Sequence, residues 1–201
     1  ETKNYTSGGE GGLLLINNPL FFERAEIIRE KGTDRSKFFR GAVDKYTWQD
    51  VGSSYLPSEL QAAYLFSQLE NADRINEYRL RAWNYYYQAF EEECSLGLIE
   101  RPHIPQACEH NGHLFYLLMR SRDERAGFIN YMKSLGIMSV FHYVPLHSSP
   151  AGRKFGLFSG DDIYTTNRSE RLVRLPLYFG IKDDELTYVI DSAKQYLSKL
   201  I

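Results

Sequence analysis

The stretch that decides the fold is Thr2-Lys3-Asn4-Tyr5-Thr6-Ser7-Gly8-Gly9-Glu10-Gly11-Gly12, which runs directly into Leu13-Leu14-Leu15-Ile16. The apolar run is short and bounded by turn formers, which predicts a buried strand rather than a helix. Four of the five residues 8–12 are glycines, so the loop can turn sharply and a ligand can approach its backbone closely. The sequence therefore predicts a ligand-binding loop beside a core strand.

Lys3 precedes this loop by a few residues. A lysine fixed there suits a covalent role, because a desolvated amine loses its proton more readily and can form a Schiff base with a carbonyl group. A solvated surface lysine before a hairpin is the alternative interpretation, since most lysines are exposed. Lys31, Lys37 and Lys45 lie at a helix end or in a polar segment, where solvated side chains are the default.

The composition excludes several classes of partner. The chain has 24 Lys and Arg against 26 Asp and Glu, a net charge of −2, so neither nucleic acid nor a membrane surface is indicated. No apolar run is long enough to span a membrane. Cys94 and Cys108 are too few for a disulfide framework, which favours a reduced, cytoplasmic compartment. The histidines at 103, 110 and 113 lack metal-motif spacing, so no metal site is predicted.

Four blocks of sequence stand out along the chain. They are the lysine loop, Gly52-Ser53-Ser54-Tyr55-Leu56-Pro57 with Gln68-Leu69, Phe141-His142-Tyr143-Val144-Pro145-Leu146-His147, and a closing set made of Ser169-Glu170-Arg171, Leu175-Pro176-Leu177 and Asp183-Asp184-Glu185. In this order they resemble the signatures of the DegT-type sugar aminotransferases, which depend on pyridoxal 5′-phosphate (PLP). The resemblance covers nearly the whole chain.

The resemblance implies a fold and a division into domains. The expected fold class is α/β with an α+β small domain, the C-terminal half of a fold-type I PLP aminotransferase, with about half of the enzyme upstream. Residues 1–56 would be a remnant of the large PLP-binding α/β domain, 57–96 long connecting helices, and 97–201 the small C-terminal α+β domain.

Capping signals and hydrophobic periodicity predict the individual elements. Asn18 and Pro19 open a helix that ends at Gly32. A second helical stretch runs from Pro57 to about Glu93, with a break near residues 71–76. The other predicted elements are a polar and aromatic connection at 33–56, strands at His113–Met119 and Met138–Tyr143, a loop around Ser148–Gly152, and helices at Asp123–Leu135, Thr165–Arg174 and Asp184–Leu200, the last with Asp183 as N-cap.

Site residues follow from the resemblance, position by position. Lys3 would hold PLP and then move a proton between substrate and cofactor, which makes it both anchor and general base. Ser54 stands where the family usually has an asparagine that reaches the cofactor phosphate across a dimer interface. The remaining expected contacts are with the substrate, at Tyr46 in the aromatic connection and at His142, Tyr143 and His147.

The implied partners are a sugar nucleotide and an amino-acid donor, in a homodimer whose subunits share active sites. Leu56 occupies a position where some family members carry an arginine for the donor carboxylate, which leaves Arg35 and Arg40 as substitutes. Two alternatives stay open. The chain could be a non-catalytic folded fragment or assembly module, or the enzyme could act on a different sugar nucleotide.

Overall fold

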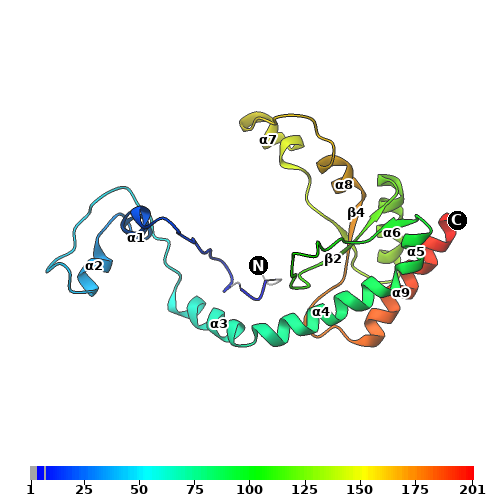
Figure 1. Ribbon diagram of the computed structural model, residues 1–201, viewed down its shortest axis with the longest axis horizontal. Helices are drawn as coiled ribbons and strands as arrows, with labels where there is room; N and C mark the ends of the chain where they lie inside the picture. The colour runs from blue at the N-terminus through cyan, green and yellow to red at the C-terminus, as the bar shows by residue number, and fades with distance from the viewer. Residues whose placement is uncertain (1–3, 7) are drawn as a thin grey trace. The chain divides into compact units, whose positions relative to one another are not determined.

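A computed structural model describes residues 4–6 and 8–201, which divide into two units, Glu1–Ala72 and Asp73–Ile201 (Figure 1). The division falls inside the segment 57–96, which the sequence assigns to connecting helices. The predicted domain boundaries of the intact protein remain predictions. No helix among the described residues is both long and apolar enough to cross a membrane.

The first unit is made of short helices joined by extended chain. Asn18 accepts a hydrogen bond from the Leu20 amide at 3.1 Å and Pro19 occupies the first turn, which confirms the predicted helix start. Ser58 and Gln61 cap the last helix reciprocally. The elements are η1 Pro19–Phe21, α1 Phe22–Arg29, α2 Arg35–Phe39 and α3 Glu59–Glu70.

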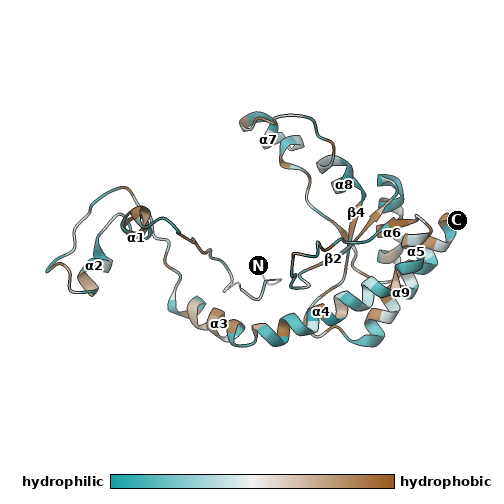
Figure 2. Cartoon of the chain, viewed as in Figure 1, coloured by the Kyte–Doolittle hydropathy of each residue, from teal (hydrophilic) through white to brown (hydrophobic). Residues whose placement is uncertain are grey.

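The predicted buried strand at Leu13–Ile16 is wrong for this structure. Leu13, Leu14 and Leu15 are 87%, 74% and 80% exposed, and Figure 2 shows the stretch as a hydrophobic extended segment leading to α1. A strand needs a neighbour to satisfy its backbone N–H and C=O groups. Nothing among the described residues pairs with this stretch.

The second unit begins at Asp73, the second residue of α4. The helix break that the sequence predicts lies just before it, because α3 ends at Glu70 and α4 starts at Ala72. Its elements are α4 Ala72–Ala89, α5 Glu91–Ser95, β1 Ile99–Glu100, β2 Phe115–Met119, α6 Arg122–Ser134, β3 Val140–Phe141, η2 Leu146–Ser148, α7 Pro150–Phe155, α8 Thr165–Arg171, β4 Leu172–Leu175, α9 Asp183–Leu197 and η3 Ser198–Leu200. The mixture of helices and sheet agrees with the predicted fold class.

The four strands form one antiparallel sheet in the order β1-β2-β4-β3. Side chains alternate between the two faces of a strand, and the inner face carries the core. Phe115, Leu117 and Val173 are completely buried there. Helices α4, α6 and α9 pack against this face and supply the rest of the core, which includes Trp83, Tyr86, Phe128, Met132, Leu186, Val189, Ile190, Ala193 and Leu197 (Figure 1).

Three details of the second unit correct the sequence prediction. The helix expected at Thr165–Arg174 ends at Arg171, and the next four residues form β4, which pairs with both β2 and β3. Pairing on both sides satisfies the backbone there, a long-range effect with no local signal. Residues 150–155 form α7 instead of a loop. The N-cap of α9 is Lys182, because Asp183 already lies in the first turn.

Candidate functional site

The predicted site residues fall in different parts of the structure. Lys3 lies outside the described residues. Tyr46 and Ser54 belong to the first unit, and His142, Tyr143 and His147 belong to the second. The structure therefore describes two groups of predicted residues, one in each unit.

The described part of the glycine loop has the open geometry that the sequence predicts. Gly9 and Gly11 adopt φ values of 105° and 147°, a region that favours glycine. No described atom lies within 4 Å of the position that a Cβ would take at either residue. A Cβ on Gly8, in contrast, would lie 2.7 Å from the Gln61 carbonyl oxygen of α3. The loop thus runs close to α3 at one end and leaves free space at the other.

Ser54 is held by its backbone and exposes its side chain. It forms an antiparallel bridge with Glu30, and next to it the Lys31 amide donates to the Ser53 carbonyl at 3.0 Å. These bonds anchor the chain to the end of α1 and leave the Ser54 side chain exposed. An exposed hydroxyl in this position can donate a hydrogen bond to a phosphate.

Two glycines allow the chain to close at the end of α1. Gly32 has φ 77°, and a Cβ there would lie 1.7 Å from the Asp50 carbonyl oxygen. A Cβ on Gly52 would lie 2.2 Å from the Gly32 nitrogen. The Gly32 amide also donates to the Ile27 carbonyl at 2.8 Å, but α1 ends at Arg29 with Glu30 as C-cap, so the helix end predicted at Gly32 is too late. Residues 33–51 are therefore a loop whose two ends touch.

Replacing Gly32 with alanine is expected to open this closure. The new Cβ would collide with backbone, which costs about 2 kcal/mol or more beyond the roughly 1 kcal/mol of a positive φ. Gly41→Ala is the matched control, because Gly41 has φ 71° and no atom within 4 Å of its Cβ position. Hydrogen exchange at the Gln49 and Asp50 amides, which donate to the Gly32 carbonyl at 2.7 and 3.0 Å, measures the opening. Equal loss of protection in both variants would contradict the argument.

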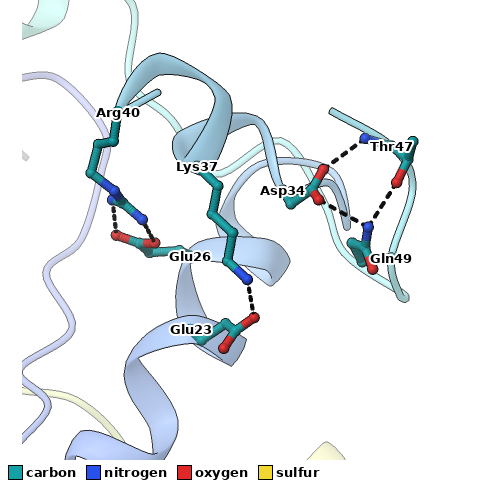
Figure 3. A network of polar contacts seen from close by, with 7 residues as sticks. All are labelled: Glu23, Glu26, Asp34, Lys37, Arg40, Thr47 and Gln49. Atoms are coloured by element: carbon teal, nitrogen blue, oxygen red, sulfur yellow. Dashed lines mark hydrogen bonds and ion pairs between the residues drawn. The ribbon is translucent and has the colours of Figure 1, made fainter. Parts of the chain in front are cut away.

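Ion pairs fasten α2 to α1 inside this loop (Figure 3). Arg40 donates two hydrogen bonds of 2.7 Å to the Glu26 carboxylate, and these bonds hold the pKa of Glu26 below its ordinary value. Lys37 pairs with Glu23. Exposed pairs of this kind add little to stability. The Arg40 guanidinium is thus occupied by an acid of its own unit.

The residues between α2 and Ser54 are ordered by further polar contacts. Asp34 accepts hydrogen bonds from the Thr47 amide at 2.7 Å and from the Gln49 side chain at 3.0 Å (Figure 3). Tyr46 stacks edge-on against Phe38, with ring centroids 5.7 Å apart, and about half of its side chain is exposed. The predicted connection is therefore a folded loop that presents aromatic surface.

In the second unit, His142 and Tyr143 directly follow β3. Their rings meet edge-on at 5.0 Å between centroids, and the Tyr143 carbonyl accepts a hydrogen bond of 2.8 Å from the Ser169 hydroxyl of α8. Tyr143 is exposed, whereas His142 is partly covered. A ligand can therefore reach the Tyr143 ring at this edge of the sheet, whereas the Nδ1 atom of His142 is covered.

His147 is fixed by a carboxylate that the sequence analysis does not single out. Its Nε2 lies 2.8 Å from an Asp162 oxygen, and its ring lies 4.3 Å from the Phe158 ring between centroids. Thr166 donates to Asp162 from both its hydroxyl and its amide. These hydrogen bonds lower the pKa of Asp162, and the bond from the Thr166 hydroxyl has the largest effect. No local signal joins residues 147 and 162, because α7 and the chain after it separate them in the sequence.

A pocket of about 460 Å³ opens beside His147. Its walls are mainly apolar, with one arginine, and are formed by Leu146, His147, Gly152, Arg153, Gly156, Leu157 and Phe158. A polar hollow of about 560 Å³ elsewhere in the unit, lined by Asn76, Leu80, Glu109, His110 and Asn111, contains none of the predicted site residues. The pocket at His147 is therefore the one that coincides with the sequence prediction.

The closing sequence block is structural in this unit. Arg171 donates to the Met119 carbonyl at 2.6 Å and pairs with Glu100 at 2.5 Å, and Arg168 pairs with the same carboxylate. Burial raises the pKa of Glu100, but the two arginines outweigh it and lower the pKa overall.

Among the residues that the structure describes, no group of three or more His, Cys, Asp or Glu could hold a metal ion.

Comparison with known proteins gives one family and several relatives. The model of the DegT/DnrJ/EryC1/StrS aminotransferase family matches residues 1–194. The uncharacterized protein MJ1066 of Methanocaldococcus jannaschii is 31% identical over 98% of this chain and 52% of its own. The dTDP-3-amino-3,4,6-trideoxy-alpha-D-glucose transaminase of Streptomyces venezuelae is 24% identical over 98% of this chain and 48% of its own.

A solved structure shows the same fold. The aminotransferase TlmJ from Streptoalloteichus hindustanus superposes with a TM-score of 0.80 at 19% identity, over 96% of this chain and 49% of its own. This chain thus spans about half the length of the curated relatives and of the solved structure that it matches.

Proposed function

Because the chain belongs to the DegT/DnrJ/EryC1/StrS aminotransferase family, we propose that it is part of an enzyme that transfers an amino group from an amino acid to a keto group on a nucleotide sugar. The observation that carries the proposal is the family match over residues 1–194, which includes the lysine loop and all four sequence blocks. The related transaminase of Streptomyces venezuelae acts on a dTDP-sugar, which supports this substrate class.

Aminotransferases of this family use PLP, and the described residues fit such a group. The glycine loop leaves open space at Gly9 and Gly11, and Ser54 exposes a hydroxyl. PLP supplies an electron sink when bound. In our proposal the Lys3 amine anchors the cofactor and moves the proton at the reacting carbon, and the Ser54 hydroxyl donates to its phosphate.

The substrate contacts that we propose lie in both units. Tyr46 presents a half-exposed ring in the first unit; in the second, His142 and Tyr143 follow β3, and His147 lines a pocket. The Asp162 carboxylate fixes the orientation of His147 through Nε2. An oriented imidazole beside an apolar pocket can hydrogen-bond one hydroxyl of a sugar while the apolar wall covers the ring.

The narrower proposal names glutamate as donor and a dTDP-4-keto-6-deoxy sugar as acceptor. The sequence Gly52-Ser53-Ser54-Tyr55-Leu56 and the block at residues 141–147 resemble the corresponding segments of the transaminase that makes dTDP-4-amino-4,6-dideoxygalactose. That product enters cell-surface polysaccharides such as enterobacterial common antigen and lipopolysaccharide. The two separate cysteines, Cys94 and Cys108, support a cytoplasmic location.

A substrate panel with the intact, PLP-loaded protein tests both levels of the proposal. Glutamate is supplied with dTDP-4-keto-6-deoxyglucose, with the 3-keto isomer or with the corresponding GDP sugar, and 2-oxoglutarate release is measured. Turnover with the 4-keto dTDP sugar alone supports the narrower proposal. Turnover with another sugar would show that this sugar, and not the 4-keto dTDP sugar, is the substrate. No turnover with any donor or acceptor would favour the non-catalytic assembly module.

We also propose that the intact protein is a homodimer with shared active sites. The apolar and aromatic residues of α3 and of the folded loop are exposed in the first unit: Leu60, Tyr64, Phe66 and Leu69 on α3, and Phe39, Tyr46 and Trp48 in the loop. An exposed apolar surface of this kind is typical of protein interfaces. A second copy of the chain is the partner that we propose for it.

Mixing two inactive variants tests the sharing of sites. A Lys3→Ala subunit lacks the anchoring amine, and a Ser54→Ala subunit lacks the phosphate donor. If Ser54 reaches into the partner's site, a mixed dimer contains one site with both defects and one with neither. Up to about half of the dimers formed at random are mixed, so the mixture is expected to recover a substantial fraction of activity. Activity no higher than the average of the separate variants would show that each subunit builds its own site.

A further inference from the structure

A series of hydrogen bonds joins Thr166, Asp162 and His147 beside the pocket that His147 lines. Thr166, in the first turn of α8, donates to Asp162 from its hydroxyl and, at 3.2 Å, from its amide. The Oδ2 atom of Asp162 lies 2.8 Å from Nε2 of His147. The side chains of His147 and Asp162 are each only 21% exposed, so the start of α8 holds the carboxylate, and the carboxylate holds the ring.

The carboxylate also decides which nitrogen of the His147 ring carries hydrogen. The bonds from Thr166, and then that from His147, lower the pKa of Asp162. Asp162 is therefore ionised near neutral pH and has acceptors but no donor. Its bond to Nε2 needs the hydrogen on Nε2, and the Thr166 oxygen, 3.4 Å from the same nitrogen, is a second acceptor. In the neutral ring the lone pair is then on Nδ1.

The Nδ1 atom of His147 is the part of the ring that remains for a ligand. None of the residues that the structure describes hydrogen-bonds this atom, and solvent reaches it. The walls of the pocket are mainly apolar, and Arg153 is their one charged donor. A lone pair on Nδ1 can accept from an O–H group but cannot bind the unprotonated oxygens of a phosphate. The pocket thus offers an acceptor for a hydroxyl next to apolar surface.

We propose that Asp162 is a positioning residue that keeps hydrogen on Nε2 of His147, so that Nδ1 accepts a hydrogen bond from a sugar hydroxyl of the substrate, an inference that rests on the proposed aminotransferase function. Asp162 thereby selects the kind of group that the ring binds, which is a donor and not an acceptor. The proposed dTDP-4-keto-6-deoxy sugar has hydroxyls at its second and third carbons, and its methyl group suits an apolar wall.

The nitrogen chemical shifts of His147 measure the position of the hydrogen directly. The intact protein is labelled with ¹⁵N-histidine and studied above neutral pH, and the His147 signals are those lost in His147→Gln. We expect the Nε2–H form in the parent protein. In Asp162→Asn the new amide can donate to Nε2, so the share of the Nδ1–H form should rise. Asp162→Glu should keep the Nε2–H form, and Asp161→Asn, which removes the same charge at an exposed neighbour, serves as control.

Fluorinated sugars test the direction of the bond to the ligand. Fluorine can stand in place of a hydroxyl but cannot donate a hydrogen bond. Calorimetry compares dTDP-6-deoxyglucose, which has no keto group to react, with its 2-fluoro and 3-fluoro forms. The parent protein and Asp161→Asn should bind one fluoro form about 10-fold more weakly than the hydroxyl sugar, the factor for one net hydrogen bond. Asp162→Asn should lose most of this preference.

The two readouts separate a positioning role from a structural one, because neither depends on turnover. An Nδ1–H ring in the parent protein, or an unchanged tautomer in Asp162→Asn, would overturn the proposal. Equal binding of the three sugars by the parent protein, or an equal preference in Asp162→Asn, would do so as well. If the tautomer and the preference are as expected but the parent protein turns over no sugar, the hydroxyl site stands and the aminotransferase function is refuted.

Discussion

Lys3→Ala is expected to abolish transamination by the intact protein. The amine is proposed both to anchor PLP and to move the proton at the reacting carbon, and loss of a general base alone costs about 10²–10⁴-fold in rate. Removing both roles at once should lower the single-turnover rate with glutamate by at least about 10³-fold. Stopped-flow absorbance of the bound cofactor follows this step directly.

Two controls make the Lys3 result interpretable. Lys45→Ala removes an exposed lysine of the folded loop and should leave the rate close to that of the parent protein. A small primary amine added to Lys3→Ala should restore part of the proton transfer, because it can replace the missing base but not the covalent anchor. Full activity of Lys3→Ala, or an equal effect of Lys45→Ala, would contradict the assignment.

Phe115→Ala is expected to unfold or severely destabilise the second unit. The ring is completely buried in β2 and contacts those of Trp83 and Tyr86, with centroids 5.5 and 5.2 Å away. Removing a buried phenylalanine costs about 3–5 kcal/mol through lost transfer energy and the cavity that remains. That is a large share of a typical domain stability of about 5–15 kcal/mol.

Thermal and denaturant unfolding, followed by tryptophan fluorescence with Trp48 replaced by phenylalanine so that only Trp83 reports, measure the Phe115→Ala effect. Met138→Ala is the matched control, since Met138 is 81% exposed and its truncation should change the unfolding free energy by no more than about 0.5 kcal/mol. A loss of less than about 1 kcal/mol in Phe115→Ala would mean that the ring is not part of a close-packed core.

Local chemistry accounts for the parts of the fold that the sequence predicts correctly. Asn18 with Pro19 marks a helix start, and the break before Ala72 follows from the length of the helical pattern. Each signal acts between residues that are close in the sequence. The site residues of the third block follow from motif resemblance and stay predictions; His142 and Tyr143 follow β3, and His147 lines one pocket.

Contacts between distant residues explain what the sequence does not reveal. β4 exists because β2 and β3 pair with it on both sides, although its residues continue a helical pattern. Asp162 becomes a partner of His147 only through the fold of the intervening chain. Leu13–Leu15 carries a strand signal, but a strand is a property of a pair, and the described residues offer it no neighbour.

The meeting of Gly32 with Gly52 has a consequence for how this protein can diverge. Residues 33–51 leave and rejoin the chain at nearly the same point, so their length does not affect the spacing of α1 and α3. The entropy of closing a loop grows only slowly with length, by about 0.6 kcal/mol for each doubling. Insertions, deletions or whole replacements between the two glycines are therefore tolerable to the rest of the unit. The aromatic surface of this segment can therefore change, in evolution or by exchange between homologues, without a change in the rest of the unit.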